Sequence, residues 1–226
     1  MKLLLTNDGS HTLMVEELNE TYHSVHGALQ ESRHVFIKNG FRYILGKNPR
    51  KPLRIFELGL GTGLNALLTA MESQKLSVPV EYTCIEPYPV PEVIISQLNF
   101  HEILDLPFVK DYFGKIHSVG WDQMNQIHSF FKFRKVQSTI QEFHISAGYF
   151  HLVYYDAFAP NKQPEMWQRD VLQKVYGILS KESALVTYCA QGQVKRDLKA
   201  SGFTVQSLQG PPGKKEMTRG LKGQSS

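Results

Sequence analysis

Three glycines within five residues constrain this chain more than any other feature of its sequence. Gly59, Gly61 and Gly63 follow an apolar run, residues 53–58, and precede a helical pattern that begins at Leu64. Glycine allows a sharp turn and lets a ligand approach the backbone without a Cβ atom in between. The free N–H groups at the start of the helix can bind an anionic group. We therefore expect a strand, a ligand-binding turn and a helix.

The remaining pattern places this unit in an alternating α/β domain. Strands are expected at 53–58, 80–85, 133–137, 150–155, 184–189 and 203–208, helices at 64–71, 93–104, 164–179 and 194–200, and irregular structure at 106–130. This alternation is typical of a doubly wound, mainly parallel sheet. Such sheets bind ligands beyond the carboxyl ends of their strands.

The first 50 residues do not share the alternation. A strand pair is expected around Asp8-Gly9-Ser10, because Asp-Gly favours a tight turn, and a helix is expected at 28–45. We therefore expect residues 1–50 to form a lead-in, a hairpin plus a helix, packed on a Rossmann-like domain of residues 51–226.

Composition limits the cellular setting. The two cysteines, Cys84 and Cys189, are too few for a disulfide framework and favour a reducing compartment. No stretch approaches the roughly 18 apolar residues of a membrane span. Clustered metal ligands are not apparent, so no metal is expected. The sequence predicts a cytoplasmic protein without membrane contact.

Basic residues concentrate in the last part of the chain. From Lys195 onward there are seven lysines and arginines and two acidic residues, whereas the whole chain has a formal net charge of +4. A basic surface near an active site suits a polyanion such as RNA. A solvated tail that only improves solubility is the alternative.

The spacing of the glycines distinguishes between ligands. A dinucleotide fingerprint has the spacing G-x-G-x-x-G, whereas this loop reads G-x-G-x-G, and no Gly-Lys-Ser/Thr of a Walker loop follows. With an acid two positions before the first glycine, the loop resembles the methyltransferase loop that holds the amino-acid end of S-adenosyl-L-methionine. The cofactor-binding residues expected here are Glu57, Gly59, Gly61, Thr62, Gly63 and Asn65. A turn that is rich in glycine for packing alone is the alternative.

Two later strand ends complete the predicted cofactor site. Glu86 follows the second strand, where an acid can accept hydrogen bonds from both ribose hydroxyls. Thr139 and Ile140 follow the third strand, near the expected position of the adenine. An exposed strand-end acid and a plain loop are the respective alternatives.

The loop after residues 150–155 carries the predicted catalytic group. Asp156 ends the strand, and Phe158 and Pro160 follow it. If the acceptor is an amine, an adjacent carboxylate can orient it and stabilise the positive charge that develops on nitrogen. Phe158 could form a wall of the site or stack on a base. Asp156 as a strand-end cap and Phe158 as a core residue are the alternatives.

Several segments together resemble one family. Residues 56–65 (FELGLGTGLN), 156–167 and 210–220, with the lead-in motifs at 22–24 and 27–36, are similar to the methyltransferase domain of the MnmC family. The resemblance implies a class I S-adenosyl-L-methionine-dependent methyltransferase with a Rossmann-like fold and a short N-terminal extension. It also implies the last methylation in making 5-methylaminomethyl-2-thiouridine at the tRNA wobble position, on the primary amine of 5-aminomethyl uridine.

The resemblance also implies roles for particular residues. Asp156 faces the acceptor and the cofactor, and Lys214, Lys215 and Arg219 lie near the substrate entrance, where they meet phosphates of the tRNA anticodon loop. The remaining residues expected on the substrate side are Tyr22, Ser24, Glu31, Phe158 and Pro160.

Two departures from the family pattern matter. The family commonly has an acid near the position of Thr139. Its bifunctional members add a flavin-dependent domain, which a chain of 226 residues cannot hold, so the sequence resembles the stand-alone form often called MnmD, expected to act as a monomer without flavin. A methyltransferase or aminopropyltransferase acting on a small-molecule amine and a non-catalytic RNA-binding module are the competing interpretations.

Overall fold

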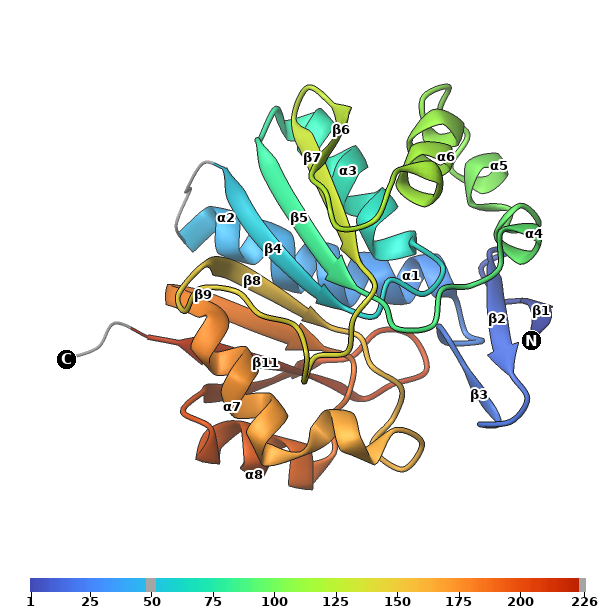
Figure 1. The fold of residues 1–226 in the computed structure, drawn as a ribbon. Coiled ribbons are helices and arrows are strands. Elements are labelled where there is room, and N and C mark those ends of the chain that lie inside the picture. Colours follow the sequence, from blue (N-terminus) through green and yellow to red (C-terminus); the bar gives the residue numbers. More distant parts are fainter. Residues whose placement is uncertain (48–51, 224–226) are drawn as a thin grey trace.

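The main sheet forms the centre of the molecule. The computed structural model describes residues 1–47 and 52–223. Within these ranges the sheet has eight strands (Figure 1). In spatial order they are β10 (Thr204–Gln209), β11 (Glu216–Lys222), β9 (Leu179–Thr187), β8 (Phe150–Tyr155), β4 (Leu53–Leu58), β5 (Val80–Ile85), β7 (Phe131–Val136) and β6 (Asn125–His128).

The strand order reverses beside the glycine loop. From β4 the chain builds outward through β5 to β7, all parallel, and then returns to place β8 and β9 on the other side of β4, again parallel. The strands β6 and β11 run antiparallel to their neighbours. The switch point therefore lies between β4 and β8, which is where a doubly wound sheet opens a crevice for a ligand.

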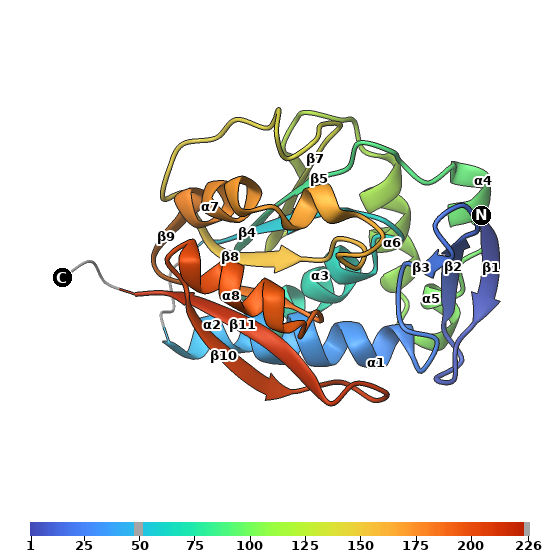
Figure 2. The same cartoon turned by 90° about the horizontal axis from the view of Figure 1, so that it is seen from below.

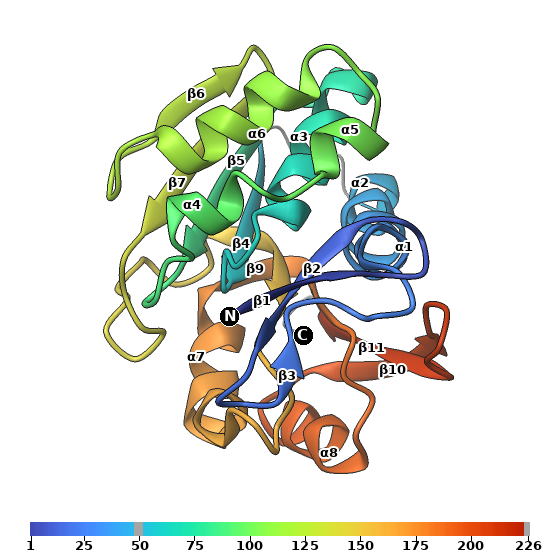
Figure 3. The same cartoon turned by 90° about the vertical axis from the view of Figure 1, so that its right-hand side faces the viewer.

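Helices cover both faces of the sheet, so its central strands are buried on both sides. Consecutive residues of β4 point to opposite faces: Ile55 packs in the core with η1, α3 and α6, and Phe56 packs in the core with α7 and α8. Figure 3 shows α3 and α7 on opposite sides of the sheet. The helical elements are α1 (Ala28–Ser32), the π-helix η1 (Arg33–Arg42), α2 (Tyr43–Lys47), α3 (Leu64–Leu76), α4 (Glu92–Ile95), α5 (Phe100–Ile103), α6 (Val109–Ser118), the 3₁₀-helix η2 (Pro164–Trp167), α7 (Arg169–Ile178) and α8 (Gly192–Ala200).

The N-terminal segment forms a small sheet of its own. Strands β1 (Lys2–Leu5), β2 (His11–Val15) and β3 (Glu20–Thr21) are antiparallel, and β1 and β2 form the predicted strand pair around the Asp8-Gly9 turn. Figures 1 and 3 place this sheet beside the carboxyl ends of the main strands. The Asn99 side chain joins it to the core by accepting a hydrogen bond from His11 N and donating one to Gly9 O.

The helical run that follows extends along the main sheet. The run α1–η1–α2 confirms the helix predicted at 28–45, and Figure 2 shows it beside the β10–β11 hairpin. The predicted domain boundary between residues 50 and 51 lies outside the described residues, so the division of the chain into a lead-in and a Rossmann-like domain remains a proposal.

Some predicted elements were wrong. Residues 106–130 are not irregular, because α6 and β6 lie there. The apolar residues of α6 are Val109, Tyr112, Phe113 and Ile116, at the i, i+3, i+4, i+7 spacing of a helix face. The helix expected at 93–104 is two short helices, α4 and α5, and the one expected at 164–179 is η2 followed by α7.

The carboxyl-terminal part of the chain also differs from the expectation. Strand β11 was not predicted. Its alternation of polar and apolar residues is obscured by the basic residues that suggested a solvated tail. Within the described ranges, no helix has the length and apolar character needed to cross a membrane.

Candidate active site

The carboxyl ends of β4, β5 and β8 open into one cavity of about 710 Å³. The glycine loop after β4, Glu86 after β5 and the loop from Asp156 to Phe158 after β8 all line it. Residues of the N-terminal sheet and of the segment after it, including Tyr22 and His23, form another wall. Because β4 and β8 are parallel neighbours, their carboxyl ends necessarily lie at the same edge of the sheet.

The glycine loop has the backbone conformation for which glycine is needed. Gly59, Gly61 and Gly63 have φ angles of 83°, 51° and 75°, in the left-handed region. A Cβ atom at Gly61 would lie 2.7 Å from the Tyr22 ring. A Cβ atom at Gly59 would meet only the carbonyl oxygen of Asp156, at 3.6 Å, so this part of the loop is a cradle left open on the cavity side.

An asparagine joins the two acidic strand ends. Asn65, in the first turn of α3, donates through Nδ2 to Glu57 Oε1 at 2.9 Å and to Asp156 Oδ2 at 2.8 Å. Glu57 and Asn65 are buried, whereas Asp156 lines the cavity. The amide NH₂ group is the donor in both hydrogen bonds, and one carboxyl oxygen of each acid accepts. Asn65 therefore fixes the position of Asp156 relative to the glycine loop.

Burial changes the acidity of these groups. It raises the pKa of Asp156 to about 7, with a further increase from the nearby Glu31 carboxylate, and the Asn65 hydrogen bond only partly offsets this. Burial also raises the pKa of Glu57 well above its ordinary value. Asp156 can therefore accept or release a proton near neutral pH, as a general acid or base must.

Glu86 connects the second strand end to the glycine loop. Its Oε2 accepts a hydrogen bond from Gly61 N at 3.0 Å and its Oε1 accepts one from Tyr88 N at 2.9 Å. Burial raises the pKa of Glu86 despite these backbone donors. Each carboxylate oxygen has a second lone pair that can accept from a hydroxyl group.

The residues predicted near the adenine also line the cavity. Thr139 Oγ1 donates to Glu142 Oε2 at 3.0 Å and accepts from Glu142 N at 3.3 Å, so its hydroxyl group is used within its own turn. Ile140 is buried and presents an apolar surface. Their contact with an adenine stays a prediction.

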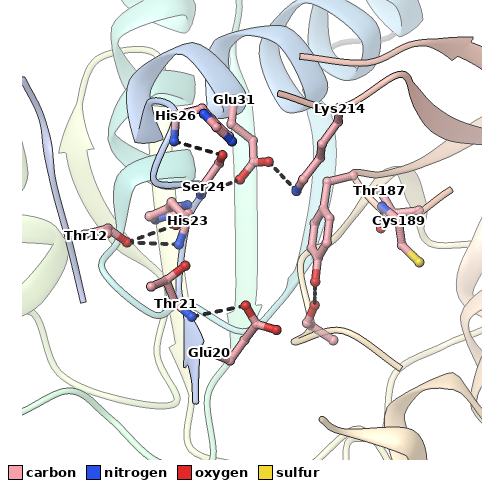
Figure 4. Close-up of polar contacts among 12 residues, drawn as sticks. Thr12, Glu20, Thr21, His23, Ser24, His26, Glu31, Thr187, Cys189 and Lys214 are labelled. Atoms are coloured by element: carbon pink, nitrogen blue, oxygen red, sulfur yellow. Dashed lines mark hydrogen bonds and ion pairs between the residues drawn. The ribbon is translucent and has the colours of Figure 1, made fainter. Parts of the chain in front are cut away.

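Most residues predicted on the substrate side come together. Tyr22, Ser24, Glu31, Phe158 and Lys214 all line the cavity. The rings of Tyr22 and Phe158 meet edge to face, with centroids 5.1 Å apart. Figure 4 shows Glu31 and Lys214 pointing toward each other, with Nζ 2.5 Å from Oε2.

Three residues predicted on the substrate side do not line this cavity. Pro160 lies outside its wall, and Lys215 lines a neighbouring pocket of about 550 Å³. The expectation for Arg219 was wrong. Its side chain is buried, donates to Gln206 Oε1 at 2.9 Å and to Asn39 O at 3.3 Å, and lies 3.5 Å above the Tyr43 ring. Arg219 therefore joins β11 to η1 and α2, away from the entrance.

Two residues of the site were not recognised in the sequence. Tyr188 directly follows β9, donates its hydroxyl proton to Ala157 O at 2.9 Å, and lies under Lys214. Its position after a strand was a usable signal, because ligands gather at carboxyl ends. His23 is buried, its Nε2 lies 2.8 Å from Thr62 Oγ1, and burial lowers its pKa to about 4. Nothing in its local sequence indicated this contact.

The described residues contain no group of three or more histidine, cysteine, aspartate or glutamate side chains that could hold a metal ion.

Comparison with known proteins relates this geometry to characterised folds. A family model described as "S-adenosyl-L-methionine-dependent methyltransferase" matches residues 107–223. The tRNA 5-methylaminomethyl-2-thiouridine biosynthesis bifunctional protein MnmC of Leptospira interrogans is 30% identical over 227 residues, which cover 96% of this chain and 35% of that protein. The chain thus spans about a third of the length of this curated relative.

Two solved structures show the same fold. The crystal structure of MNMC2 from Aquifex aeolicus has a TM-score of 0.78 and 23% identity, covering 100% of this chain and 72% of that one. Spermidine synthase from Thermotoga maritima has a TM-score of 0.52 and 11% identity, covering 94% of this chain and 68% of that one. These likenesses confirm the predicted Rossmann-like fold, and the family model identifies it as that of class I methyltransferases. Because a spermidine synthase shares this fold, only the site can indicate the reaction.

Proposed function

Because this chain belongs to the S-adenosyl-L-methionine-dependent methyltransferase family, we propose that it methylates the primary amine of 5-aminomethyl-(2-thio)uridine at the wobble position of tRNA. The proposed product is 5-methylaminomethyl-(2-thio)uridine, and the proposed location is the cytoplasm. The choice of nucleoside is supported by the 30% identity to the MnmC protein of Leptospira interrogans. Monomeric action remains a prediction.

The residues present fit the cofactor. The open cradle at Gly59 and the turn through Gly61, Thr62 and Gly63 can hold its amino-acid end, and Glu86 can accept from its ribose hydroxyls. Thr139 and Ile140 are the proposed adenine contacts. When bound, the cofactor supplies an electrophilic methyl group on a sulfonium ion. Acidic groups around the cavity favour such a cation.

One observation carries the proposal: the Asp156 carboxylate and the glycine loop open into the same cavity. Methyl transfer needs the acceptor nitrogen in line with the methyl group, and positioning of this kind supplies much of the rate enhancement. Asp156, fixed by Asn65, can hold the acceptor amine, take its proton near neutral pH and stabilise the charge that forms on nitrogen.

The aromatic side chains near Asp156 can receive a base. Tyr22 and Phe158 present ring surface to the cavity, and Trp167 Nε1 donates to Phe158 O at 2.7 Å, which fixes the loop. RNA-modifying proteins read unpaired loop bases by stacking and by contacts to the base edges. We propose that the wobble base turns out of the anticodon loop and places its aminomethyl group next to Asp156.

Nucleoside analysis of tRNA tests this function. The protein is incubated with labelled S-adenosyl-L-methionine and with tRNA that lacks the methyl group of the wobble nucleoside. The tRNA is then digested, and its nucleosides are separated and identified by mass spectrometry. We expect 5-methylaminomethyl-(2-thio)uridine to form with wild-type protein and almost none with Asp156→Asn.

Other outcomes identify the competing functions. Unchanged tRNA together with methylated or aminopropylated polyamines would contradict the proposal and support a small-molecule amine transferase. Tight tRNA binding without any product would indicate a non-catalytic RNA-binding module.

A further inference from the structure

The charges that line the cavity are unbalanced. Among the described residues of its wall, five are acidic and one, Lys214, is a lysine. The acidic residues are Glu20, Glu31, Glu86, Asp156 and Glu165. A cavity of this kind attracts cations, so the position taken by its lysine side chain shows where another ammonium group can be held.

Lys214 lies in a seat made of a carboxylate and an aromatic ring. Its ammonium group is 2.5 Å from Glu31 Oε2 and 3.9 Å from the centroid of the Tyr188 ring. An acid and an aromatic face are the two groups that proteins use to hold ammonium ions. The seat therefore has the chemistry of an ammonium-binding site, whichever ammonium ion occupies it.

Hydrogen bonds fix the two groups of the seat, whereas Lys214 is partly exposed. The Glu31 side chain is 6% exposed, and its second oxygen accepts a hydrogen bond from Ser24 N at 3.0 Å (Figure 4). The Tyr188 ring is held by the hydrogen bond of its hydroxyl group to Ala157 O. Lys214, in contrast, reaches in from the turn between β10 and β11, and its flexible side chain is 32% exposed.

We propose that Glu31 and Tyr188 form the binding subsite for the acceptor's primary ammonium group, and that Lys214 occupies this subsite until the substrate displaces it. This inference rests on the proposed function and extends it, because it names the groups that recognise the acceptor before the reaction. Lys214 is thereby a stand-in for the substrate, in place of the phosphate contact that the family resemblance implied.

The exchange preserves the charge balance of the site. One ammonium replaces another, so the buried Glu31 carboxylate is not left unpaired when the acceptor enters, which would be strongly unfavourable. Lys214 is free to swing toward solvent on its four-carbon stem. Glu31 and Asp156 line the same cavity, and the Glu31 carboxylate contributes to the raised pKa of Asp156.

The bound ammonium is then activated by Asp156. One N–H bond breaks and its proton moves to a carboxylate oxygen of Asp156, while the electron pair of that bond stays on nitrogen. The neutral nitrogen uses this pair to form the bond to the methyl group, and the electrons of the broken sulfur–carbon bond stay on sulfur. The product nitrogen carries one positive charge, as the substrate did on entry.

Calorimetric titration with benzylammonium chloride tests the subsite without tRNA. Wild-type protein should bind this probe weakly, because the probe must displace Lys214. The apparent affinity equals the intrinsic affinity multiplied by the fraction of molecules in which the site is empty. Lys214→Met should bind at least about tenfold more tightly, if the seat is filled nine-tenths of the time. Lys214→Arg should bind as weakly as wild type, and Glu31→Gln should lose binding.

Matched variants separate the subsite from general charge effects. Lys199→Met removes an exposed lysine from α8 and should leave probe affinity unchanged. In the Lys214→Met protein, the additional change Tyr188→Leu should weaken binding of benzylammonium several-fold. The additional change Tyr188→Phe keeps the ring and should not weaken it. Thermal melting identifies any variant that fails to fold. If Lys214→Met does not fold, the affinities of Tyr188→Leu and Tyr188→Phe for benzylammonium, each made in otherwise wild-type protein, test the subsite instead.

Two results would overturn the inference: probe affinity unchanged or weaker in folded Lys214→Met, or equal affinity in Tyr188→Leu and Tyr188→Phe. Because the probe is not tRNA, failure of tRNA methylation with this binding pattern intact would refute the proposed function alone. Normal tRNA methylation with the pattern absent would refute the subsite alone.

Discussion

Asp156 shows at the scale of single residues how two opposing effects set the acidity of a carboxyl group. The Asn65 hydrogen bond favours its ionised form, whereas burial and the neighbouring Glu31 favour its protonated form. The balance raises its pKa to about 7, so burial is the larger effect. Because burial disfavours the ionised form, the Asp156 carboxylate lowers the stability of the protein when it is ionised. The same burial brings its pKa near neutral pH, where it can transfer protons.

Asp156→Asn should therefore increase stability while reducing turnover. The folded-state pKa lies above the ordinary value of 3.8, so the free energy of unfolding of wild-type protein falls as pH rises from about 4 to about 7. At pH 8 we expect the variant to be more stable by about 1–2 kcal/mol, since Asp156 faces the cavity and is partly screened. Turnover should fall by about a hundredfold or more.

Urea denaturation at pH 5 and pH 8, together with single-turnover rates, measures both effects. A variant that is less stable than wild type at pH 8 would contradict the acidity described for Asp156. A variant that keeps its turnover would contradict its role in the reaction.

Gly61→Ala adds a single methyl group and should destabilise the folded protein. Gly61 has a φ of 51°, and the new Cβ atom would lie 2.7 Å from the Tyr22 ring. We expect a loss of about 1–3 kcal/mol in the free energy of unfolding and weaker cofactor binding, because both strain and overpacking occur.

Gly46→Ala is the matched control, since no atom lies within 4 Å of its Cβ position and it is in helix α2. There we expect a gain of about 0.5–1 kcal/mol. Chemical denaturation and calorimetry with S-adenosyl-L-methionine compare the two. Equal stability of both variants would contradict the close approach of Tyr22 to the loop.

At the scale of elements, α6 supports the glycine loop from outside. His117, in the last turn of α6, lies with Nε2 3.2 Å from Thr62 O, and a Cβ atom at Gly63 would be 2.7 Å from the same nitrogen. On the cavity side, His23 holds the Thr62 hydroxyl group. The loop is thus fixed between two histidines from distant segments, which the strand–turn–helix pattern alone could not indicate.

These histidines should make the protein sensitive to acid. Burial lowers the pKa of His117 to about 4, from an ordinary value of 6.5. The unfolded chain therefore binds more protons between these values, so stability is fully present above about pH 6.5 and is lost as pH falls toward 4. His117→Gln should reduce the difference in the free energy of unfolding between pH 7.5 and pH 5 by about 1 kcal/mol.

Denaturation curves at the two pH values test this, with His144→Gln as a control at an exposed position. A pH difference in His117→Gln as large as that of wild type would show that burial beside the loop does not hold His117 neutral.

The elements also show the reach of sequence-based prediction. The strands β4, β5 and β8 and the second part of β9 were predicted because most of their residues are buried and apolar. The first part of β9, Leu179–Ser183, was not predicted because it contains serine, lysine and glutamate residues. Strand β11 was missed because its basic residues hid the strand pattern, and because its insertion between β10 and β9 is not visible in the local sequence. Its basic residues look solvated in sequence and are partly buried in the fold.

At the scale of the whole molecule, the cavity is assembled from three distant parts of the chain. The N-terminal segment supplies Tyr22 and Glu31, the sheet supplies the glycine loop and Asp156, and the β10–β11 turn supplies Lys214. The residues of the Glu31–Lys214 pair are 183 positions apart in sequence. Such a site exists only in the complete fold.

The same arrangement separates two basic residues that the sequence grouped together. Lys215 is exposed beside the cavity and is free to meet a phosphate group, whereas Arg219 is buried in contacts with Gln206, Asn39 and Tyr43. Lys215→Gln should lower the slope of tRNA affinity against salt concentration by about one, as expected for one lost phosphate contact. Arg219→Gln should leave that slope unchanged and lower the free energy of unfolding by about 1–3 kcal/mol.

Filter binding across a range of salt concentrations, with urea denaturation of both variants, separates the two roles. A reduced salt slope in Arg219→Gln with unchanged stability would place Arg219 at the RNA surface after all.

Local patterns in the sequence determined the order of the central strands and helices, the turn made by Gly59, Gly61 and Gly63, and the acid that ends β8. Periodicity, glycine spacing and the residues at strand ends indicate short-range geometry. The tertiary structure therefore kept the glycine turn and the acid at the end of β8 where the sequence predicted them. Only the tertiary structure decided that Tyr188 and Glu31 surround Lys214, that His117 supports the loop, and that Arg219 is buried. These contacts join residues tens to hundreds of positions apart, and long-range packing leaves no periodic trace in either partner's local sequence.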